Sequence, residues 1–226
     1  MRSICFILGI LALNPIFGQV MKKVTYHFEV GTSLTIPYKS KIEIFPDIVD
    51  HPIYNYKPNL GYFAGALIEY NFNNKFFLMS GIDYIHSRLR IDSKTGIIEI
   101  KGNINSTYFN IPLIIQFKFF EKIPLKIGIG SYFSTLLEAK EKGTLYIKDS
   151  PISYSDEQPC DYDIKNRYNS SDFGIMCQFD YDFRFTNKIN TVFFSKLNYG
   201  LVDVLKNQDN YKWKNYNLLI GLGIKI

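Results

Sequence analysis

The stretch from His86 to Arg90, which reads His-Ser-Arg-Leu-Arg, carries residue types that could do chemistry. A serine next to a histidine would supply a nucleophile and a general base if the two side chains met. Polar and apolar residues alternate through this stretch, however, which predicts a β-strand with adjacent side chains on opposite faces. Ser87 and His86 therefore cannot pair, and we expect no catalytic residues. His86, Arg88 and Arg90 share one face, and an arginine guanidinium group is suited to binding a phosphate.

A second candidate site lies in an acidic stretch further along the chain. Asp161 and Asp163 have the spacing of the first two ligands of a calcium loop, but Lys165 and Asn166 stand where a further ligand and a glycine belong. No cysteine and histidine pair has the spacing of zinc ligands. We therefore expect neither a metal nor another cofactor.

The composition is that of a folded chain of one domain, or two at most. Of the 226 residues, 46% are hydrophobic, 16% are aromatic and 21% are charged, and the formal net charge is +5. The lysines and arginines are scattered rather than clustered. The charge pattern therefore gives no reason to expect a nucleic-acid partner.

The N-terminal residues differ from the rest of the chain. One cation precedes an apolar run over residues 4–13, which is followed by a helix-ending Asn14-Pro15 pair and a small residue. This layout is typical of a cleaved secretory signal, and the run is too short to span a membrane. We expect residues 1–18 to be a signal peptide and residues 19–226 to form the mature domain, with a retained anchor as the alternative.

The mature chain consists of runs in which apolar residues recur at every second position, the pattern of β-strands with two unlike faces. In the run Tyr108–Phe117, for example, Phe109, Ile111 and Leu113 alternate with Asn110 and Pro112. Because proline lacks a donor for the strand ladder, we expect a local bulge at Pro112. Eight strands are predicted, at residues 24–35, 60–72, 75–90, 106–119, 124–137, 171–185, 189–200 and 214–226.

The connections between these strands alternate in length. Long ones are expected at residues 36–59, 91–105, 138–170 and 201–213, and short ones at residues 73–74, 120–123 and 186–188. Long and short connections at opposite ends are typical of an antiparallel up-and-down barrel with one elaborated rim. We therefore predict an all-β, eight-stranded, antiparallel up-and-down barrel.

Alternation alone does not say which face points outward. A soluble lipocalin-like barrel would turn its apolar face inward, but eight strands enclose too little space for five or six large apolar side chains from each strand. The opposite face carries small residues that suit a crowded interior: Gly61, Gly65, Gly81, Gly128, Gly130, Gly174, Gly221 and Gly223. The apolar face is thus expected to meet lipid, which makes the chain a transmembrane barrel.

The glycine-bearing face also carries charges of both signs. An aqueous channel or a proton path could use such charges, but in so narrow a barrel they are expected to pair and fill the interior as a plug. The plug is predicted to contain Glu29, Glu69, Asp83, Lys118, Lys126, Asp180, Asp182, Arg184, Lys196 and Lys225.

The strand "YFNIPLIIQFKF", with the glycine-bearing run "GYFAGALIEYNFNNKFFLMSGIDY" and the closing "LLIGLGIKI", resembles the PorT-like outer-membrane β-barrel family. The most recognisable feature of that family is a Tyr-x-x-Ile-Pro-Leu strand, found here at Tyr108, Ile111, Pro112 and Leu113. The resemblance implies an eight-stranded barrel in the outer membrane, generally without an assigned chemical function. One member of the family assists protein secretion, but no residue matched here carries that role over.

A signal peptide followed by a membrane barrel indicates the outer membrane of a Gram-negative cell, with both termini in the periplasm and the long loops outside. At the outer head groups, His86, Arg88 and Arg90 are a candidate contact for lipopolysaccharide phosphates, and the alternative is a solvated rim that only anchors the barrel at this depth. Loop 138–170, with acidic residues among tyrosines, is a candidate surface for an envelope or extracellular partner. The expected role is structural, accessory or binding and non-enzymatic; the alternatives are a narrow channel or a transport or secretion accessory protein, and then a lipid-modifying enzyme.

Overall fold

The structure, a computed structural model, describes residues 23–37, 41–43, 53–95, 98–147, 156–186, 189–206 and 214–226. The expected signal peptide, residues 1–18, lies outside the described residues. The elements are β1 (Val24–Pro37), β2 (Lys41–Glu43), β3 (Ile53–Asn71), β4 (Phe76–Thr95), β5 (Ile98–Lys118), β6 (Leu125–Ile147), β7 (Asp156–Asp163), the 3-10 helix η1 (Lys165–Arg167), β8 (Ser171–Thr186), β9 (Ile189–Gly200) and β10 (Asn215–Lys225). Among the described residues, no helix has the length and apolar character that crossing a bilayer requires.

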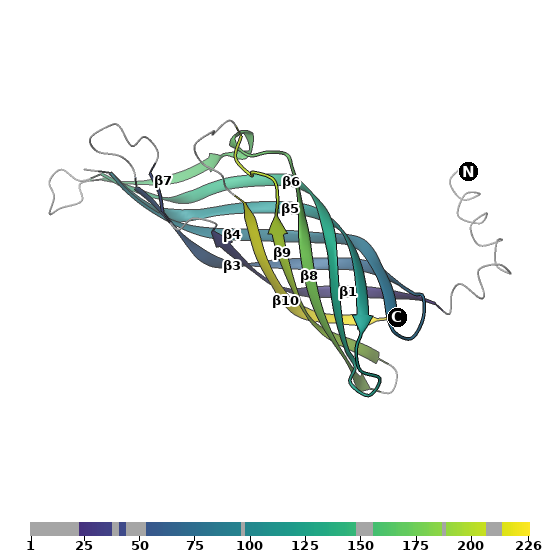
Figure 1. Ribbon diagram of the computed structural model, residues 1–226. Coiled ribbons are helices and arrows are strands. Elements are labelled where there is room, and N and C mark those ends of the chain that lie inside the picture. Colours follow the sequence, from purple (N-terminus) through teal and green to yellow (C-terminus); the bar gives the residue numbers. More distant parts are fainter. Residues whose placement is uncertain are drawn as a thin grey trace, which may run out of the picture.

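Eight of the strands close into a ring, and every pairing in it is antiparallel. The ring runs β1-β10-β9-β8-β6-β5-β4-β3, and β1 pairs again with β3, so that the first strand has a hydrogen-bonded neighbour on each side. The first residues of β1 and the last residues of β10 lie at the end that carries the connections 72–75 and 119–124, here called the short-turn end (Figure 1). The predicted eight-stranded up-and-down barrel is thus confirmed.

The strands form where the alternation places them. In β1, Tyr26 and Phe28 are exposed on the outside of the ring, whereas His27 and Glu29 are buried inside it. The inward and outward sides predicted for the cleanest run, residues 171–185, also hold in β8 for the side chains that the structure describes. In a strand whose two faces meet different surroundings, the period-two alternation alone assigns each side chain to the inside or the outside of the ring.

The rim opposite the short-turn end differs from the sequence prediction. Residues 91–105 do not form a long loop, because β4 continues to Thr95 and β5 begins at Ile98. Residues 138–170 are also partly strand, since β6 continues to Ile147 and pairs there with β7. The extended parts of β3, β4, β5 and β6, flanked by β2 and β7, form an open sheet that projects beyond β8, β9 and β10 and is here called the arm (Figure 1).

The physical reason for the arm is that the alternation continues after the outer face becomes polar. Ile91 and Ile104 are buried on the inner side, while Arg90 and Lys101 are exposed on the outer side. A polar outer face resembles a loop in composition, yet the inner residues still alternate and pack.

The bulge predicted at Pro112 is wrong. Ser80 pairs with Leu113 and Asp83 pairs with Asn110 in one unbroken register, so no extra residue is inserted into β5. The β4–β5 ladder instead skips the two positions between these pairs, where the missing proline donor would lie, and the Ser80 hydroxyl donates to the Pro112 carbonyl oxygen at 2.7 Å. The register shift that involves β5 lies earlier in the strand, between Thr107 and Tyr108 in the pairing with β6, where Leu137 of β6 is the additional residue.

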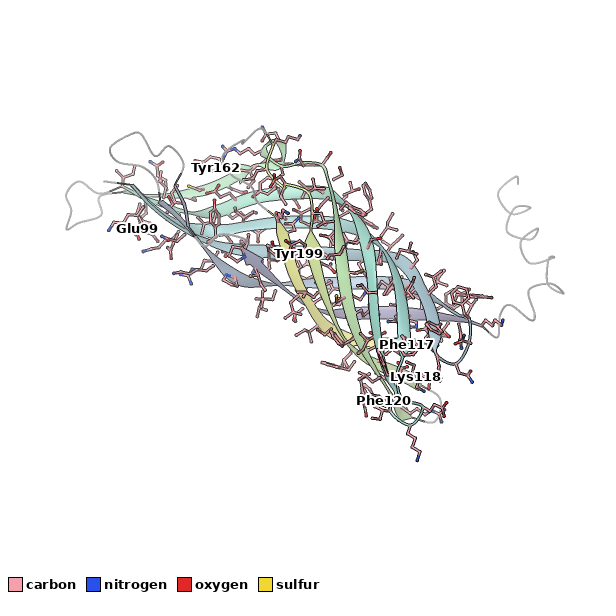
Figure 2. The ribbon with its side chains drawn as sticks, in the orientation of Figure 1. Glu99, Phe117, Lys118, Phe120, Tyr162 and Tyr199 are labelled. Carbon is pink, nitrogen blue, oxygen red and sulfur yellow. The ribbon has the colours of Figure 1, made fainter. Side chains whose placement is uncertain are left out.

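The outside of the ring carries a continuous apolar belt with aromatic rings near both edges. At the short-turn end, Phe117 contacts Phe76 and Phe119, with ring centroids 4.9 and 4.6 Å apart, and Phe120 lies beyond them (Figure 2). At the opposite edge Tyr199 packs on Tyr216 at 4.7 Å. The belt between them includes Phe28, Val30, Ile68, Ile82, Ile111, Leu113, Ile129, Ile175, Leu197, Ile220 and Leu222, all exposed.

Inside the ring, bulky side chains fill the space that the glycines leave. Phe194 packs over Gly221, and the Tyr132 ring packs over Gly174, whose Cβ, if present, would lie 2.5 Å from a ring carbon. Such pairing of large and small residues fills a narrow barrel without voids. Bulky inward residues such as Phe63, Leu67 and Phe194 were missing from the sequence prediction, which expected mainly glycine and charge on this face.

This packing predicts that Gly174→Ala destabilises the barrel. The new Cβ would lie 2.3 Å from the Tyr199 carbonyl oxygen, so that backbone must move. We expect a loss of about 1–3 kcal/mol in the free energy of unfolding, measured by urea titration of the folded band on unheated gels. Gly200→Ala is the matched control, because Gly200 pairs with Gly174 and its Cβ would come no closer than 3.1 Å to another atom. Equal losses in the two variants would contradict the packing argument.

Candidate functional site

The barrel interior contains a cluster of buried charges centred on Lys196. The Lys196 ammonium group lies 2.5 Å from a Glu29 carboxylate oxygen and 3.4 Å from Asp83, and all three side chains are fully buried. β9, β1 and β4 position these side chains at inward positions of their alternation. One cation thus holds two carboxylates that would otherwise repel each other.

A second charge cluster lies nearer the short-turn end. Lys126 lies 2.7 Å from Glu69 and 3.8 Å from Asp182, and Lys225 pairs with Asp182 and lies 4.0 Å from Glu69. The His27 ring reaches Glu69 at 3.4 Å. Two lysines are therefore matched by two carboxylates, and the cluster closes the interior across β3, β6, β8 and β10.

Asp180 has amide donors in place of a cation. Gln116 and Gln178 each donate a side-chain N–H to it, at 2.7 Å, and all three residues are buried. The plug predicted from the sequence included Asp180 but not the two glutamines. Their inward positions in the alternation are the signal that could have identified them.

Beyond these clusters the interior is packed with apolar and amide side chains. The Tyr132 hydroxyl donates to Asp172 at 3.1 Å and the Asn215 amide donates to the same oxygen at 3.0 Å, and Thr35 and Ser87 both donate to Asn217. The two cavities found in this part of the interior have volumes of about 10 Å³ each. Such a cavity has room for about one water molecule.

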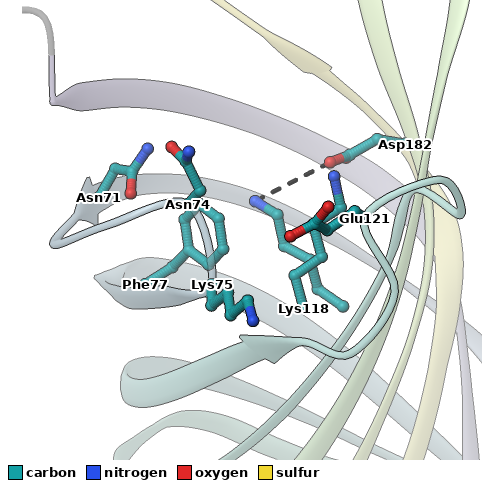
Figure 3. A pocket seen from close by; sticks show the side chains of 8 residues that line it. Asn71, Asn74, Lys75, Phe77, Lys118, Glu121 and Asp182 are labelled. Carbon is teal, nitrogen blue, oxygen red and sulfur yellow. Dashed lines mark ion pairs between the residues drawn. The ribbon is translucent and has the colours of Figure 1, made fainter.

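At the short-turn end the barrel opens into a vestibule. Two adjoining pockets of about 540 and 480 Å³ share Lys118, Lys126 and Asp182 in their walls. Figure 3 shows Asn71, Asn74, Lys75 and Phe77 on one side, with Lys118, Glu121 and Asp182 on the other. Lys118 and Arg184, both predicted for the plug, lie here: Lys118 is half-buried, Arg184 is exposed, and neither pairs with a carboxylate among the described residues.

His86, Arg88 and Arg90 point outward from β4, near the aromatic edge of the belt. The His86 ring stacks on Tyr62 at 4.7 Å and contacts the Thr107 hydroxyl at 3.1 Å. Arg88 donates to Asn105 at 3.0 Å.

The neighbouring lysines of the same face have carboxylate partners. Lys57 lies 3.2 Å from Asp92, Lys142 lies 3.1 Å from Asp161, and Lys101 pairs with Glu99. Arg88 and Arg90 have no carboxylate partner among the described residues, and neither does the exposed Lys94 further along the same strand face. The two arginines are the unpaired cations nearest to His86 and the aromatic edge of the belt.

The segment around η1 covers the inner side of the arm. Ile164 and Tyr168, on either side of η1, pack with Val204 against Leu89 and Ile104. Burial raises the pKa of the Tyr168 hydroxyl and of the Glu141 carboxyl, the latter opposed by the charge of Arg167.

The acidic residues considered for calcium do not form a cation site here. Asp161 pairs with Lys142, and Asp163 accepts a hydrogen bond from the backbone N–H of Lys165. Among the residues that the structure describes, no three His, Cys, Asp or Glu side chains form a group that could hold a metal ion.

The ring is closed and antiparallel, with an apolar outside and a polar, filled inside. The comparison with protein families gives a matching result. The model of the outer membrane protein beta-barrel domain matches residues 17–206. The chain belongs to this family. The strands of its ring are therefore transmembrane strands, and its place is the outer membrane.

Several solved outer-membrane barrels are similar to this chain at low identity. OprG from Pseudomonas aeruginosa is 13% identical, with 90% of this chain and 96% of that chain covered and a TM-score of 0.47. The attachment invasion locus protein Ail of Yersinia pestis, in complex with the heparin analogue sucrose octasulfate, is 14% identical, with 90% and 99% covered and a TM-score of 0.41. The outer membrane protease OmpT from Escherichia coli is 9% identical, with 90% and 96% covered and a TM-score of 0.48. No curated protein sequence matched the chain.

The Lys196 cluster makes this outer-membrane barrel sensitive to the loss of one cation. Lys196→Met would leave Glu29 and Asp83 buried without a counter-ion, and we expect a loss of about 3–5 kcal/mol in the free energy of unfolding. Lys57→Met is the control, because it breaks an exposed pair and should cost at most about 1 kcal/mol. Urea titration of the folded band measures both.

A further variant separates lost charge from lost packing. Lys196→Met with Glu29→Gln and Asp83→Asn removes the charges of both carboxylates together with that of the lysine, so it should recover most of the stability lost in Lys196→Met. Failure to recover would mean that the shape of Lys196, rather than its charge, holds this part of the interior.

Proposed function

We propose that this outer-membrane barrel is closed to solutes and acts without catalysis, as a structural element of the membrane or a binding platform for other envelope components. The observation that carries the proposal is the filled interior. Lys196 and Lys126 each bridge two carboxylates from different strands, and the space beyond them consists of packed side chains with cavities of about 10 Å³. A barrel filled in this way offers its outer surfaces, rather than its lumen, for function.

The proposal includes an orientation and a narrower family assignment. An even number of strands puts both ends of the ring on one side, and in bacterial barrels that side, with the short turns, is periplasmic. The arm would then be extracellular, and the signal peptide, residues 1–18, would be cleaved. The strand with Tyr108, Ile111, Pro112 and Leu113 favours a PorT-like member of the family.

The proposal excludes a serine hydrolase at the rim. Ser87 is buried and its hydroxyl donates to Asn217, whereas His86 points outward and contacts Thr107. The two groups lie on opposite faces of β4, so neither can activate the other. A lipid-modifying activity based on this pair is therefore not favoured.

On the outer face, we assign Arg88 and Arg90 to phosphate contacts with lipopolysaccharide, with His86 fixing the strand edge through its stack on Tyr62. Both arginines lie close to the aromatic edge of the belt and have no carboxylate partner among the described residues, while Lys57, Lys101 and Lys142 on the same face are paired. An arginine near the head groups can bind a phosphate with two parallel hydrogen bonds. The exposed Tyr162 of β7 and its neighbours on the arm would serve a protein partner (Figure 2).

A closed barrel should not conduct. In planar bilayers the wild-type protein is expected to give no discrete conductance steps, because the interior charges are paired and no water-filled path joins the two ends. Protein inserted into liposomes from the same preparation should retain the mobility shift between unheated and boiled samples that marks a folded barrel. Reproducible steps from such folded protein would favour the narrow channel instead.

The lipopolysaccharide contact predicts a selective loss of bound lipid. Arg88→Ala with Arg90→Ala should lower the lipopolysaccharide that co-purifies with the barrel by at least about threefold, because two charge-assisted contacts are removed. Lys57→Ala with Lys101→Ala removes the same charge from the same face, but from residues with carboxylate partners, and should change it little. An equal decrease in both double variants would point to general surface charge.

A further inference from the structure

We propose that the vestibule at the short-turn end is a binding site for a small organic oxyanion, a molecule that carries carboxylate or phosphate groups. Its two adjoining pockets, of about 540 and 480 Å³, are each large enough for a compact organic molecule. The proposal does not depend on whether the barrel conducts, nor on which side of the membrane this end faces.

The charges of the vestibule fall into a paired floor and an unpaired wall. In the floor, Lys126 and Lys225 are matched by Glu69 and Asp182. In the wall, the cations Lys75, Lys118 and Arg184 have no carboxylate within 4.0 Å among the described residues, although the exposed Glu121 also lines the cavity. The wall thus has more cationic groups than anionic ones, and its cations are free to bind a ligand.

Acids deeper in the barrel do not provide those cations with partners. Asp180 is held by Gln116 and Gln178, and the Glu29 and Asp83 carboxylates are held by Lys196. The floor separates this deeper layer from the vestibule, since Lys126 lies between Glu69 and Asp182 and also over the Phe77 ring, 3.8 Å from its centroid. An anion entering from the short-turn end would therefore meet unpaired cations first and a closed floor behind them.

The remaining lining favours an organic anion over a bare inorganic ion. Phe77 and Phe183 contribute apolar surface, and Asn71, Asn74 and Asn190 contribute amides. Lys118 and Arg184 come from β5 and β8 and would contact such a ligand together from different strands. A guanidinium fork beside an ammonium group suits a carboxylate or a phosphate group.

The experiment uses the full barrel in lipid nanodiscs and isothermal titration calorimetry. Two probes are titrated separately at low salt, inorganic pyrophosphate and the tricarboxylate tricarballylate, so that the two oxyanion classes are distinguished. Wild type is expected to bind at least one of them saturably. Lys118→Ala with Arg184→Ala should weaken that binding by about tenfold or more, because two charge-assisted contacts are lost.

The matched control is Lys23→Ala with Lys122→Ala. Both lysines are exposed at the same end but do not line either pocket, and the control removes the same amount of charge. Binding by the control should stay within about twofold of wild type. Arg184→Lys, which keeps the charge, should retain more binding than Arg184→Ala.

All variants are first checked for the heat-dependent shift in mobility that marks a folded barrel. If the vestibule variant, Lys118→Ala with Arg184→Ala, does not fold, Lys118→Gln takes its place. Saturable binding that fails in the vestibule variant and persists in the control supports the site. Absence of saturable binding of both probes to wild type overturns it. So does an equal loss in the vestibule variant and in the control, which would mean attraction by the general charge of this end.

Discussion

The closure of the ring through β1 is the interaction on which the rest of this structure depends. β1 pairs with β10 along one edge and with β3 along the other, so that no strand of the ring keeps an open edge within the apolar belt. In hydrocarbon an unpaired backbone donor or acceptor costs several kcal/mol, and closure removes that cost for all eight strands together. At Pro112, where the β4–β5 ladder is interrupted, the Ser80 hydroxyl donates to the Pro112 carbonyl oxygen and so satisfies one of the exposed backbone groups.

Closure with eight strands limits the volume of side chains that the barrel interior can hold. Glycines such as Gly174 and Gly221 leave room for Tyr132 and Phe194, and charged side chains enter only with partners. Lys196 is the clearest case, since one buried ammonium group holds two carboxylates from different strands. The interior therefore stabilises the ring and leaves the two ends and the outer face for interactions.

The two ends then differ for a physical reason. At the short-turn end, Lys118 and Arg184 lie at inward positions near the ends of β5 and β8 and line an open vestibule. At the other end β3, β4, β5 and β6 continue as the arm, whose outer face pairs most of its lysines with acids and leaves Arg88 and Arg90 without carboxylate partners among the described residues. Each end thus presents cations to a different environment.

The sequence by itself determined the strands of the ring, their faces and the presence of a plug-like set of charges, because a period of two and a narrow interior leave little choice. It did not determine the arm at residues 91–105 and 138–147, since a strand with a polar outer face resembles a loop in composition. Only the tertiary structure decided which charges meet. Lys118 is the register partner of Lys126 and shares its inward face, yet Lys126 is buried between Glu69 and Asp182, whereas Lys118 is half-buried without a carboxylate partner among the described residues. The alternation of a single strand gives the face on which a side chain lies, but its partners come from other strands and are set when the ring closes.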